Sequence, residues 1–167
     1  PEADPPRPLT PSRPDGDEPP VVSPLAGDDG LRFRRGRLIH ALLQTLPQVP
    51  STARAAAAAA FLARPVHGLG EAEQSAIAAE TLAVLDHPEF ADIFGPAGRA
   101  EVPLVGTVGG RTISAQVDRL VVTPAAVLVV DFKTNRPPPE DPAAVPPVYL
   151  RQMAAYRQAL RLVYPDR

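Results

Sequence analysis

The chain has 167 residues and a formal net charge of −2, and it contains no cysteine. This length suits one domain with a tail, and the missing cysteine excludes disulfides, cysteine-ligated zinc and cysteine-held iron–sulfur clusters. A free-standing nucleic-acid binder normally carries a basic patch, so the negative net charge indicates that any affinity for nucleic acid comes from a partner or a longer polypeptide.

The sequence has no sign of a membrane segment or of export. No apolar run reaches the roughly 18 residues that a membrane helix needs, and the start lacks the pattern of a signal peptide. We therefore expect a soluble protein in the cytoplasm, without membrane contact.

Residues 1–30 mix Pro, Asp, Glu, Gly and Ser with few apolar residues. This composition predicts a Pro-rich flexible linker and leaves residues 31–167 for one folded domain. The chain begins at Pro1 rather than at methionine. A linker followed by a domain fits a fragment of a larger protein, which we favour over removal of an initiator methionine.

Three helices are predicted after the linker. Apolar residues recur at helical spacing in residues 33–46, alanine dominates residues 51–63, and a third helical pattern covers residues 71–85. Together these segments predict an N-terminal helical layer.

The first of these helices carries a histidine of interest. Gly36 and His40 lie four residues apart and therefore share one face of the helix. Taken alone, a histidine on a helix is more often structural than a metal ligand. His67 and His87 have no comparable context, and we interpret both as surface residues.

A hairpin is predicted over residues 111–136. β-Branched residues dominate its first half, and a turn centred between Pro124 and Ala125 places Asp118 opposite Asp131. Two carboxylates so placed, with Cβ atoms roughly 4.5–5.5 Å apart, repel each other unless a cation lies between them. Hard divalent ions such as Mg²⁺ and Mn²⁺ prefer oxygen ligands, so this pair predicts a metal site.

Lys133 projects from the same face as Asp131 because side chains alternate along a strand. It is the only lysine in the chain, and every other cationic side chain is arginine or histidine. Lysine offers a compact, strongly hydrated charge that guanidinium lacks, which suits chemistry at a metal-bound water or a phosphate.

A second turn is predicted at Gly109 and Gly110. A hairpin centred there places Glu101 opposite Asp118, so a third carboxylate would join the row. Pro103 makes this first strand an edge strand, and a bulge would shift its register.

Residues 136–147 are rich in proline and predict a loop, favoured as a solvated connector over a substrate gate. Residues 148–164 return to helical spacing, with an apolar stripe that we expect to pack on the sheet. The stripe contains Tyr149, Met153, Tyr156, Leu160 and Val163. Gln152 and Tyr156 lie one turn apart and can point together toward Asp131 and Lys133. Without further context, we would read Tyr156 as a core residue and Gln152 as part of a solvated face.

These motifs resemble a known family. Asp118, the segment Asp131-Phe132-Lys133-Thr134 and the segment from Gln152 to Tyr156 are similar to the D…DxK…QxxxY signature of the RecB-type branch of the PD-(D/E)xK nucleases. The sequence around both aspartates is most similar to that of the C-terminal nuclease domain of AddA-type helicase-nucleases. The resemblance covers residues 34–164. Gly36 and His40 match the family's G-x-x-x-H element, in which the histidine is a metal ligand.

The resemblance implies a restriction-endonuclease-like α/β (α+β) fold, with a mixed central sheet flanked by helices and an N-terminal helical layer. It also implies another strand after the last helix, whereas this sequence ends at Arg167. We therefore expect a nuclease domain over residues 31–167 that lacks the family's final strand or is cut short.

The function implied is that of a Mg²⁺-dependent, exonuclease-type DNA nuclease domain from a helicase-nuclease that repairs double-strand breaks. By resemblance, His40, Asp118, Asp131 and the Phe132 carbonyl hold Mg²⁺ or Mn²⁺, with no iron–sulfur cluster. Lys133 orients the attacking water or stabilises charge on the phosphate, and Gln152 and Tyr156 support it. Glu101 is a further candidate carboxylate.

The implied partners are a single DNA strand from an unwound duplex, a helicase region in the same full-length chain and a second, AddB-like subunit, in the bacterial cytoplasm at the nucleoid. No GxxxxGK[ST] motif occurs, so this polypeptide is not the motor. Several arginines near the site are candidates for DNA backbone contacts, although a solvated face explains them equally well: Arg34, Arg35, Arg37, Arg119, Arg136 and Arg151.

Two alternatives remain open. The first is a catalytically silent nuclease-fold module that binds DNA or protein, and the second is a free-standing exonuclease that needs no helicase.

Overall fold

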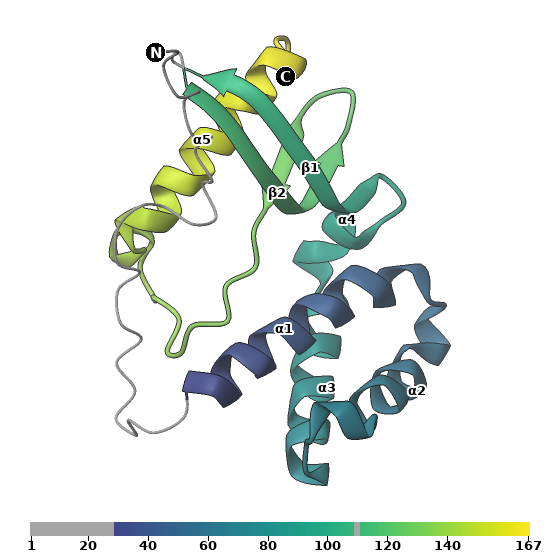
Figure 1. Cartoon of the computed structure of the whole chain (residues 1–167). Helices are drawn as coiled ribbons and strands as arrows, with labels where there is room; N and C mark the ends of the chain where they lie inside the picture. The colour runs from purple at the N-terminus through teal and green to yellow at the C-terminus, as the bar shows by residue number, and fades with distance from the viewer. Residues whose placement is uncertain (1–28, 109–110) are drawn as a thin grey trace, which may run out of the picture. The chain divides into compact units, whose positions relative to one another are not determined.

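The computed structural model describes residues 29–108 and 111–167, and these fall into two compact units on either side of residue 98. The first unit is helical, and the second combines a sheet with one long helix (Figure 1). The flexible linker predicted for residues 1–30 lies outside the described residues, except that Asp29 and Gly30 begin the first helix.

The helical unit contains α1 (Asp29–Thr45), α2 (Ser51–Leu62), α3 (Glu71–Leu85) and the short α4 (Ala91–Phe94). Both α1 and α2 pack against α3. The core includes Leu38, Leu42 and Leu46, which recur at four-residue intervals and are buried. Burying such a side chain stabilises the fold by about 1.5–3 kcal/mol. The predicted helical layer is confirmed.

Polar contacts link these helices to one another and to the segments that join them. Arg35 of α1 forms an ion pair with Glu80 of α3. Arg54 of α2 donates through Nε to the carbonyl oxygens of Leu46 and Val49, each at 3.2 Å. Because the last carbonyls of a helix have no partner within the helix, this arginine satisfies groups that follow α1.

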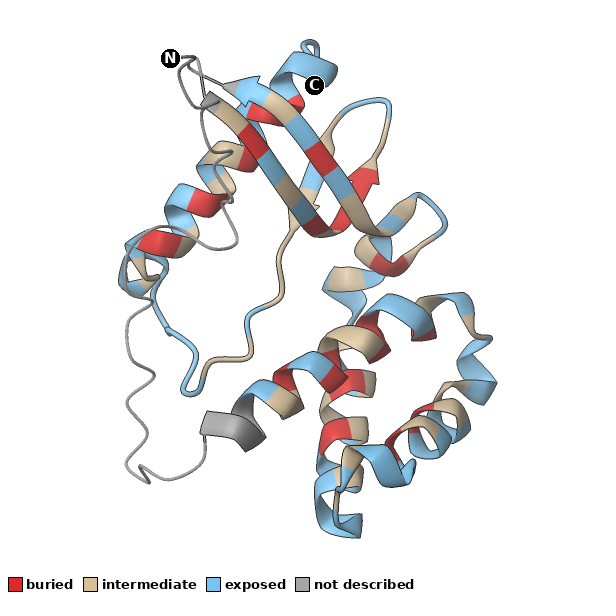
Figure 2. Ribbon diagram, viewed as in Figure 1, coloured by how far each residue is buried: buried red, intermediate tan, exposed pale blue. Residues whose placement is uncertain are grey.

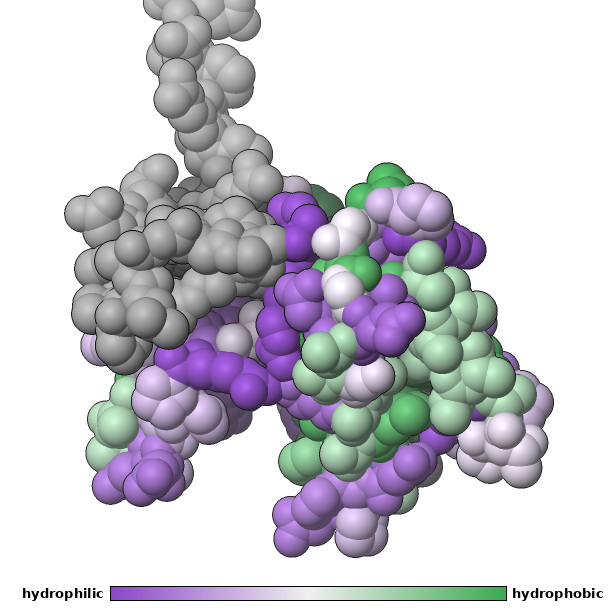
Figure 3. Space-filling view, turned by 90° about the horizontal axis from the view of Figure 1, so that it is seen from below, coloured by the Kyte–Doolittle hydropathy of each residue, from purple (hydrophilic) through white to green (hydrophobic). Residues whose placement is uncertain are grey.

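Helix α2 buries little of its surface. Its fully buried side chains are Ala58 and Leu62, one turn apart, while most of its other alanines are exposed. Alanine has the highest intrinsic helix propensity, so this helix depends on backbone preference more than on packing. Figure 3 shows hydrophilic and weakly hydrophobic residues side by side on the face seen from below.

The sheet unit contains β1 (Gly98–Val108), β2 (Arg111–Val122) and β3 (Val127–Val130), in the order β1-β2-β3. Strands β2 and β3 are antiparallel, with Arg119 opposite Val130 and Val122 opposite Val127. This is the register of a turn centred between Pro124 and Ala125, as predicted.

The turn is closed by two kinds of contact. The Thr123 backbone N–H donates to the Ala126 carbonyl at 2.9 Å, and the Thr123 hydroxyl donates to that carbonyl and accepts from the Ala126 N–H, each at 3.0 Å. Because Pro124 presets its own φ, little further ordering is needed to set the register.

Helix α5 (Pro147–Val163) packs on this sheet through contacts with β2 and β3. One core cluster joins the sheet and the helix. Its buried members are Leu104, Val117, Leu120, Tyr156, Ala159 and Leu160. In Figure 2, buried residues appear as red bands on the strands and on α5. Val163 is the last residue of α5 and is 61% exposed, so its predicted place in the stripe is wrong. The buried part of the stripe ends at Leu160, one turn earlier.

Strand β2 changes phase in its second half. Ala115 and Val117 pack in the same cluster as Leu120 and Val122, although side chains on a regular strand alternate between faces. The change from odd to even positions marks an irregularity around Asp118. In β1, Glu101 has a φ of 52°, a left-handed conformation that is uncommon for residues other than glycine. Irregularities of this kind redirect side chains, often next to active sites.

The α/β (α+β) fold class is confirmed, with five α-helices and a three-stranded sheet among the described residues. Within these residues the sheet is antiparallel, whereas the resemblance implies a mixed sheet. In the described part of the chain, no helix combines the length and the apolar character required to cross a membrane.

Candidate active site

The structure brings five of the predicted site residues into one unit. Asp118 lies on β2, Asp131 and Lys133 directly follow β3, and Gln152 and Tyr156 lie on α5. Asp131 is the residue after Val130, the last partner in the β2–β3 ladder, and Asp118 is the residue before Arg119, which is opposite Val130. The hairpin therefore delivers both carboxylates to the same end of the pair.

Asp118 holds the segment that leaves β3. Its Oδ2 accepts a hydrogen bond from the backbone N–H of Phe132 at 2.7 Å. A bond to an ionised acceptor is stronger than one between neutral groups, and this bond takes over where the regular β3 ladder has ended. Asp118 therefore fixes the backbone between Asp131 and Lys133.

Asp131 and Lys133 form an ion pair between Oδ2 and Nζ. The Asp131 side chain is only 8% exposed, whereas that of Lys133 is 35% exposed. The carboxylate is therefore enclosed by the protein, while the ammonium remains open to solvent on one side.

Gln152 joins these two charges. Its Nε2 donates to Asp131 Oδ1 at 2.9 Å, and its Oε1 accepts from Lys133 Nζ at 3.1 Å. Because an amide has one donating and one accepting end, only one orientation satisfies both neighbours. The side chain is buried, so it is not part of the solvated face that its position alone would suggest.

Tyr156 forms a hydrogen bond with the side chain of Gln152. Its hydroxyl accepts from Gln152 Nε2 at 2.8 Å and donates to the backbone carbonyl of Gln116 at 3.2 Å. With 0% of its surface exposed, Tyr156 does not touch a substrate in this arrangement. Its hydroxyl is connected to the site through Gln152.

The sequence places Tyr149 only in the apolar stripe of α5, whereas the structure shows that it contacts the site. Lys133 Nζ lies 4.8 Å from the centroid of its ring, and its hydroxyl donates to Asn135 Oδ1 at 3.1 Å. The sequence contained a signal for this contact, because Tyr149 precedes Gln152 by three residues and so lies on the same side of the helix.

His40 lies on α1, in the helical unit, and is half-buried. Its role as a metal ligand stays a prediction. Within residues 29–108 and 111–167, no three His, Asp or Glu side chains form a group able to hold a metal ion. The metal hypothesis therefore depends chiefly on Asp118, Asp131 and the carbonyl of Phe132.

Glu101 accepts from Gln116 Nε2 at 2.6 Å, and its role as a third carboxylate also stays a prediction. Arg119 is only 3% exposed, and burial lowers the pKa of its guanidinium. Its predicted place on a solvated or DNA-contacting face is therefore wrong. Arg136 and Arg151 are exposed, and their contact with DNA stays a prediction.

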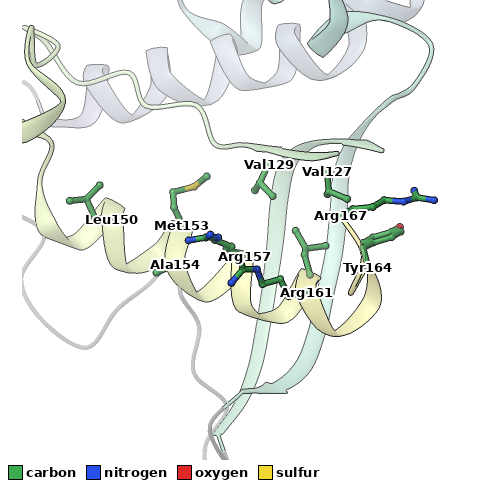
Figure 4. Close-up of a pocket in the computed structure, with 10 residues that line it drawn as sticks. Val127, Val129, Leu150, Met153, Ala154, Arg157, Arg161, Tyr164 and Arg167 are labelled. Atoms are coloured by element: carbon green, nitrogen blue, oxygen red, sulfur yellow. The ribbon is translucent and has the colours of Figure 1, made fainter. Parts of the chain in front are cut away.

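A groove of about 600 Å³ runs between β3 and α5 (Figure 4). Val127, Val129, Met153 and Leu160 supply apolar walls, and Arg157, Arg161 and Arg167 add positive charge. Asp118, Asp131, Lys133 and Gln152 are not among the residues that line the groove. The groove is thus separate from the catalytic candidates, which lie at the C-terminal end of β3.

The donor set at that end of β3 has a clear chemical character. Two carboxylates and a backbone carbonyl are hard oxygen ligands, the kind that Mg²⁺ and Mn²⁺ prefer. The chain has no thiolate to favour a softer metal. The residues present therefore fit a hard divalent cation.

The sequence pattern of the PD-(D/E)XK nuclease superfamily matches residues 23–167, which include both units. No significant match to the chain was found among curated proteins or among solved structures. The match does not distinguish branches, so the likeness to RecB-type and AddA-type nucleases stays a prediction. Because the match spans most of the chain, the chain belongs to the PD-(D/E)XK nuclease superfamily.

Proposed function

We propose that this chain is a nuclease domain that hydrolyses DNA phosphodiester bonds with the help of Mg²⁺ or Mn²⁺. Membership of the superfamily implies nuclease activity in general. The observation that carries the proposal is the joint placement of Asp131, Lys133 and Gln152 in one hydrogen-bonded group, with Asp118 fixing the backbone between them.

Asp118, Asp131 and the carbonyl of Phe132 would hold the metal, and His40 would add a nitrogen ligand. When bound, the metal would polarise the phosphate and lower the pKa of a coordinated water. The carboxylate of Asp131 has capacity for this role, because two oxygens offer about four lone-pair positions. Gln152 bonds to Oδ1 and Lys133 to Oδ2, so each oxygen keeps a lone-pair position for the metal.

Lys133 would act on the phosphate. Its ammonium has three donors, and the group is bonded to Asp131 and to Gln152. Its open side would face a phosphoryl oxygen or the attacking water, where a fixed positive charge stabilises the charge that develops in the transition state. Gln152 would hold this ammonium in place before substrate arrives.

The substrate we propose is a single DNA strand, cut in an exonuclease-type reaction. A net charge of −2 gives little general attraction to DNA. The strand would therefore be presented by a helicase region in the same full-length chain and by a second, AddB-like subunit, as in the repair of double-strand breaks. Exposed Arg136 and Arg151 would contact the backbone near the site.

Cleavage of single-stranded DNA with Mg²⁺ tests this function. Lys133→Ala should reduce the rate by about 10²–10³-fold, the usual loss when a charge-stabilising donor is removed. Arg161→Ala is the matched control, since it removes an exposed cation from α5. Equal rates in the Lys133→Ala variant and the wild type would contradict the proposal.

A catalytically silent binding module is the second candidate. It is favoured by the fact that both oxygens of Asp131 already have protein partners, as in a purely structural network. It predicts DNA or protein binding without metal-dependent cleavage. Cleavage by the wild type that is lost in Lys133→Ala would reject it. Activity that is robust without any helicase would instead favour a free-standing exonuclease.

A further inference from the structure

We propose that Tyr149 is a positioning residue for Lys133, with its ring fixing the ammonium and its hydroxyl fixing the ring. This inference rests on the proposed function only for the catalytic purpose of Lys133. The contact itself is a matter of geometry and can be tested separately.

The ring supplies a third support for the ammonium. Lys133 Nζ is bonded to Asp131 Oδ2 and to Gln152 Oε1, and it lies 4.8 Å from the centroid of the Tyr149 ring. Two hydrogen bonds leave an ammonium free to swing about the line through its two acceptors. A cation within about 6 Å of a ring centroid is attracted to the ring face, and this contact restricts the swing.

The hydroxyl of Tyr149 holds the ring in place. It donates to Asn135 Oδ1 at 3.1 Å, and Asn135 lies two residues beyond Lys133 in a segment without regular secondary structure. Tyr149 itself is in the first turn of α5, next to buried Val148. The tyrosine therefore links Lys133 and the irregular segment that follows it to helix α5.

Core packing does not explain this residue. Tyr149 is only half-buried and does not belong to the core cluster that contains Tyr156. Its polar atom and its ring face both meet residues of the segment from Asp131 to Asn135. A lysine has a long, flexible stem, and a catalytic group gains when its position is fixed before the reaction.

Three variants separate the ring from the hydroxyl. Tyr149→Leu and Tyr149→Met remove the ring, while Tyr149→Phe keeps it. We expect kcat to fall by roughly two- to fivefold in Tyr149→Leu and Tyr149→Met, with KM nearly unchanged. Tyr149→Phe keeps the ring but loses the hydrogen bond to Asn135, so its kcat should fall less than in the two ringless variants. The rate constant of cleavage is also measured in single turnovers with the protein in saturating excess, because this constant does not depend on the folded fraction.

The matched control is Tyr164→Leu. Tyr164 is also a partly buried tyrosine, and the guanidinium of Arg167 lies 5.8 Å from its ring centroid. Removing it takes away an aromatic ring and a cation contact in the same unit, with no expected effect on Lys133. A loss of kcat in Tyr164→Leu equal to that in Tyr149→Leu would reject a specific role.

The contact is tested directly by NMR of protein labelled with ¹³Cε-lysine, without metal or DNA. Because Lys133 is the only lysine, the spectrum contains one lysine Cε signal. Its protons should be shifted upfield by the ring in wild type, Tyr149→Phe and Tyr164→Leu, and this shift should disappear in Tyr149→Leu and Tyr149→Met. Having two variants without a ring keeps the test valid if one of them does not fold.

These readouts distinguish the two possible failures. An unchanged lysine signal in both ringless variants would overturn the inference, whatever the activity of the wild type. A ring shift in a wild type that does not cleave DNA would reject the proposed function, and with it the catalytic purpose assigned to Tyr149.

Discussion

Gln152 lies between Asp131 and Lys133 and bonds to both, donating to Asp131 Oδ1 at 2.9 Å and accepting from Lys133 Nζ at 3.1 Å. A carboxylate and an ammonium that already form an ion pair are thus bridged by one amide from a different element. The amide determines the mutual orientation of the two groups, because the stem of lysine alone is too flexible to do so.

Replacing this amide by a carboxylate should disrupt the group. Gln152→Glu removes the two N–H donors and places a negative charge against Asp131, so we expect a loss of about 1–3 kcal/mol in the free energy of unfolding. Cleavage should fall with it, because Lys133 would be drawn toward the new carboxylate. Urea unfolding and the cleavage assay measure the two effects.

The control for this variant is Gln158→Glu, which makes the same change at an exposed position of the same helix. It should change stability by no more than about 0.5 kcal/mol. If both variants behaved alike, the bridging role of Gln152 would be wrong.

Tyr156→Phe should destabilise the protein without moving the backbone. It deletes only the hydroxyl, which leaves the carbonyl of Gln116 and one N–H of Gln152 without this partner in a buried place. The expected cost is about 1–3 kcal/mol, measured by thermal or chemical unfolding. Tyr164→Phe, at a less buried tyrosine, should cost less, and the reverse order would contradict the network.

The charge of Asp118 can be separated from its hydrogen bond. Asp118→Asn keeps an oxygen that accepts from the Phe132 N–H, so the segment after β3 should stay in place. The loss of a carboxylate should weaken the binding of Mn²⁺, which calorimetric titration measures. Asp166→Asn, at an exposed position near the end of the chain, is the control. Undiminished binding in Asp118→Asn would exclude Asp118 as a ligand.

Asp131→Ala tests the metal site as a whole. The carboxylate of Asp131 is nearly enclosed, and its removal leaves Lys133 and Gln152 without their common partner. We expect the heat of Mn²⁺ binding to disappear and cleavage to be lost together. Identical heats in wild type and variant would remove the metal hypothesis, and chelation of the metal from the wild type should reproduce the loss of cleavage.

The helical unit gives a prediction of stability alone. Leu42 is almost completely buried on α1, so Leu42→Ala should cost about 2–5 kcal/mol through lost burial and the cavity left behind. Leu162 is an exposed leucine on α5, and Leu162→Ala should have little effect. Differential scanning calorimetry compares the two, and a small effect at Leu42 would contradict the core assignment.

Much of the fold and part of the site were predictable from the sequence. The helices of the first unit follow from apolar spacing, and the register of β2 and β3 follows from one turn around Pro124. Local rules suffice here, because helical periodicity and turn geometry act over a few residues. Once the turn is fixed, the placement of Asp118 and Asp131 at one end of the hairpin needs no further information.

Only the tertiary structure decided which partners these residues have. Gln152 could have been a solvated residue, Tyr149 a core residue and Arg119 a surface cation, and none of them is. Each outcome depends on how α5 packs against the sheet or on how strand β2 changes phase near Asp118. Such packing joins residues that are distant in sequence, and the buried environment that results determines which polar groups must bond to each other.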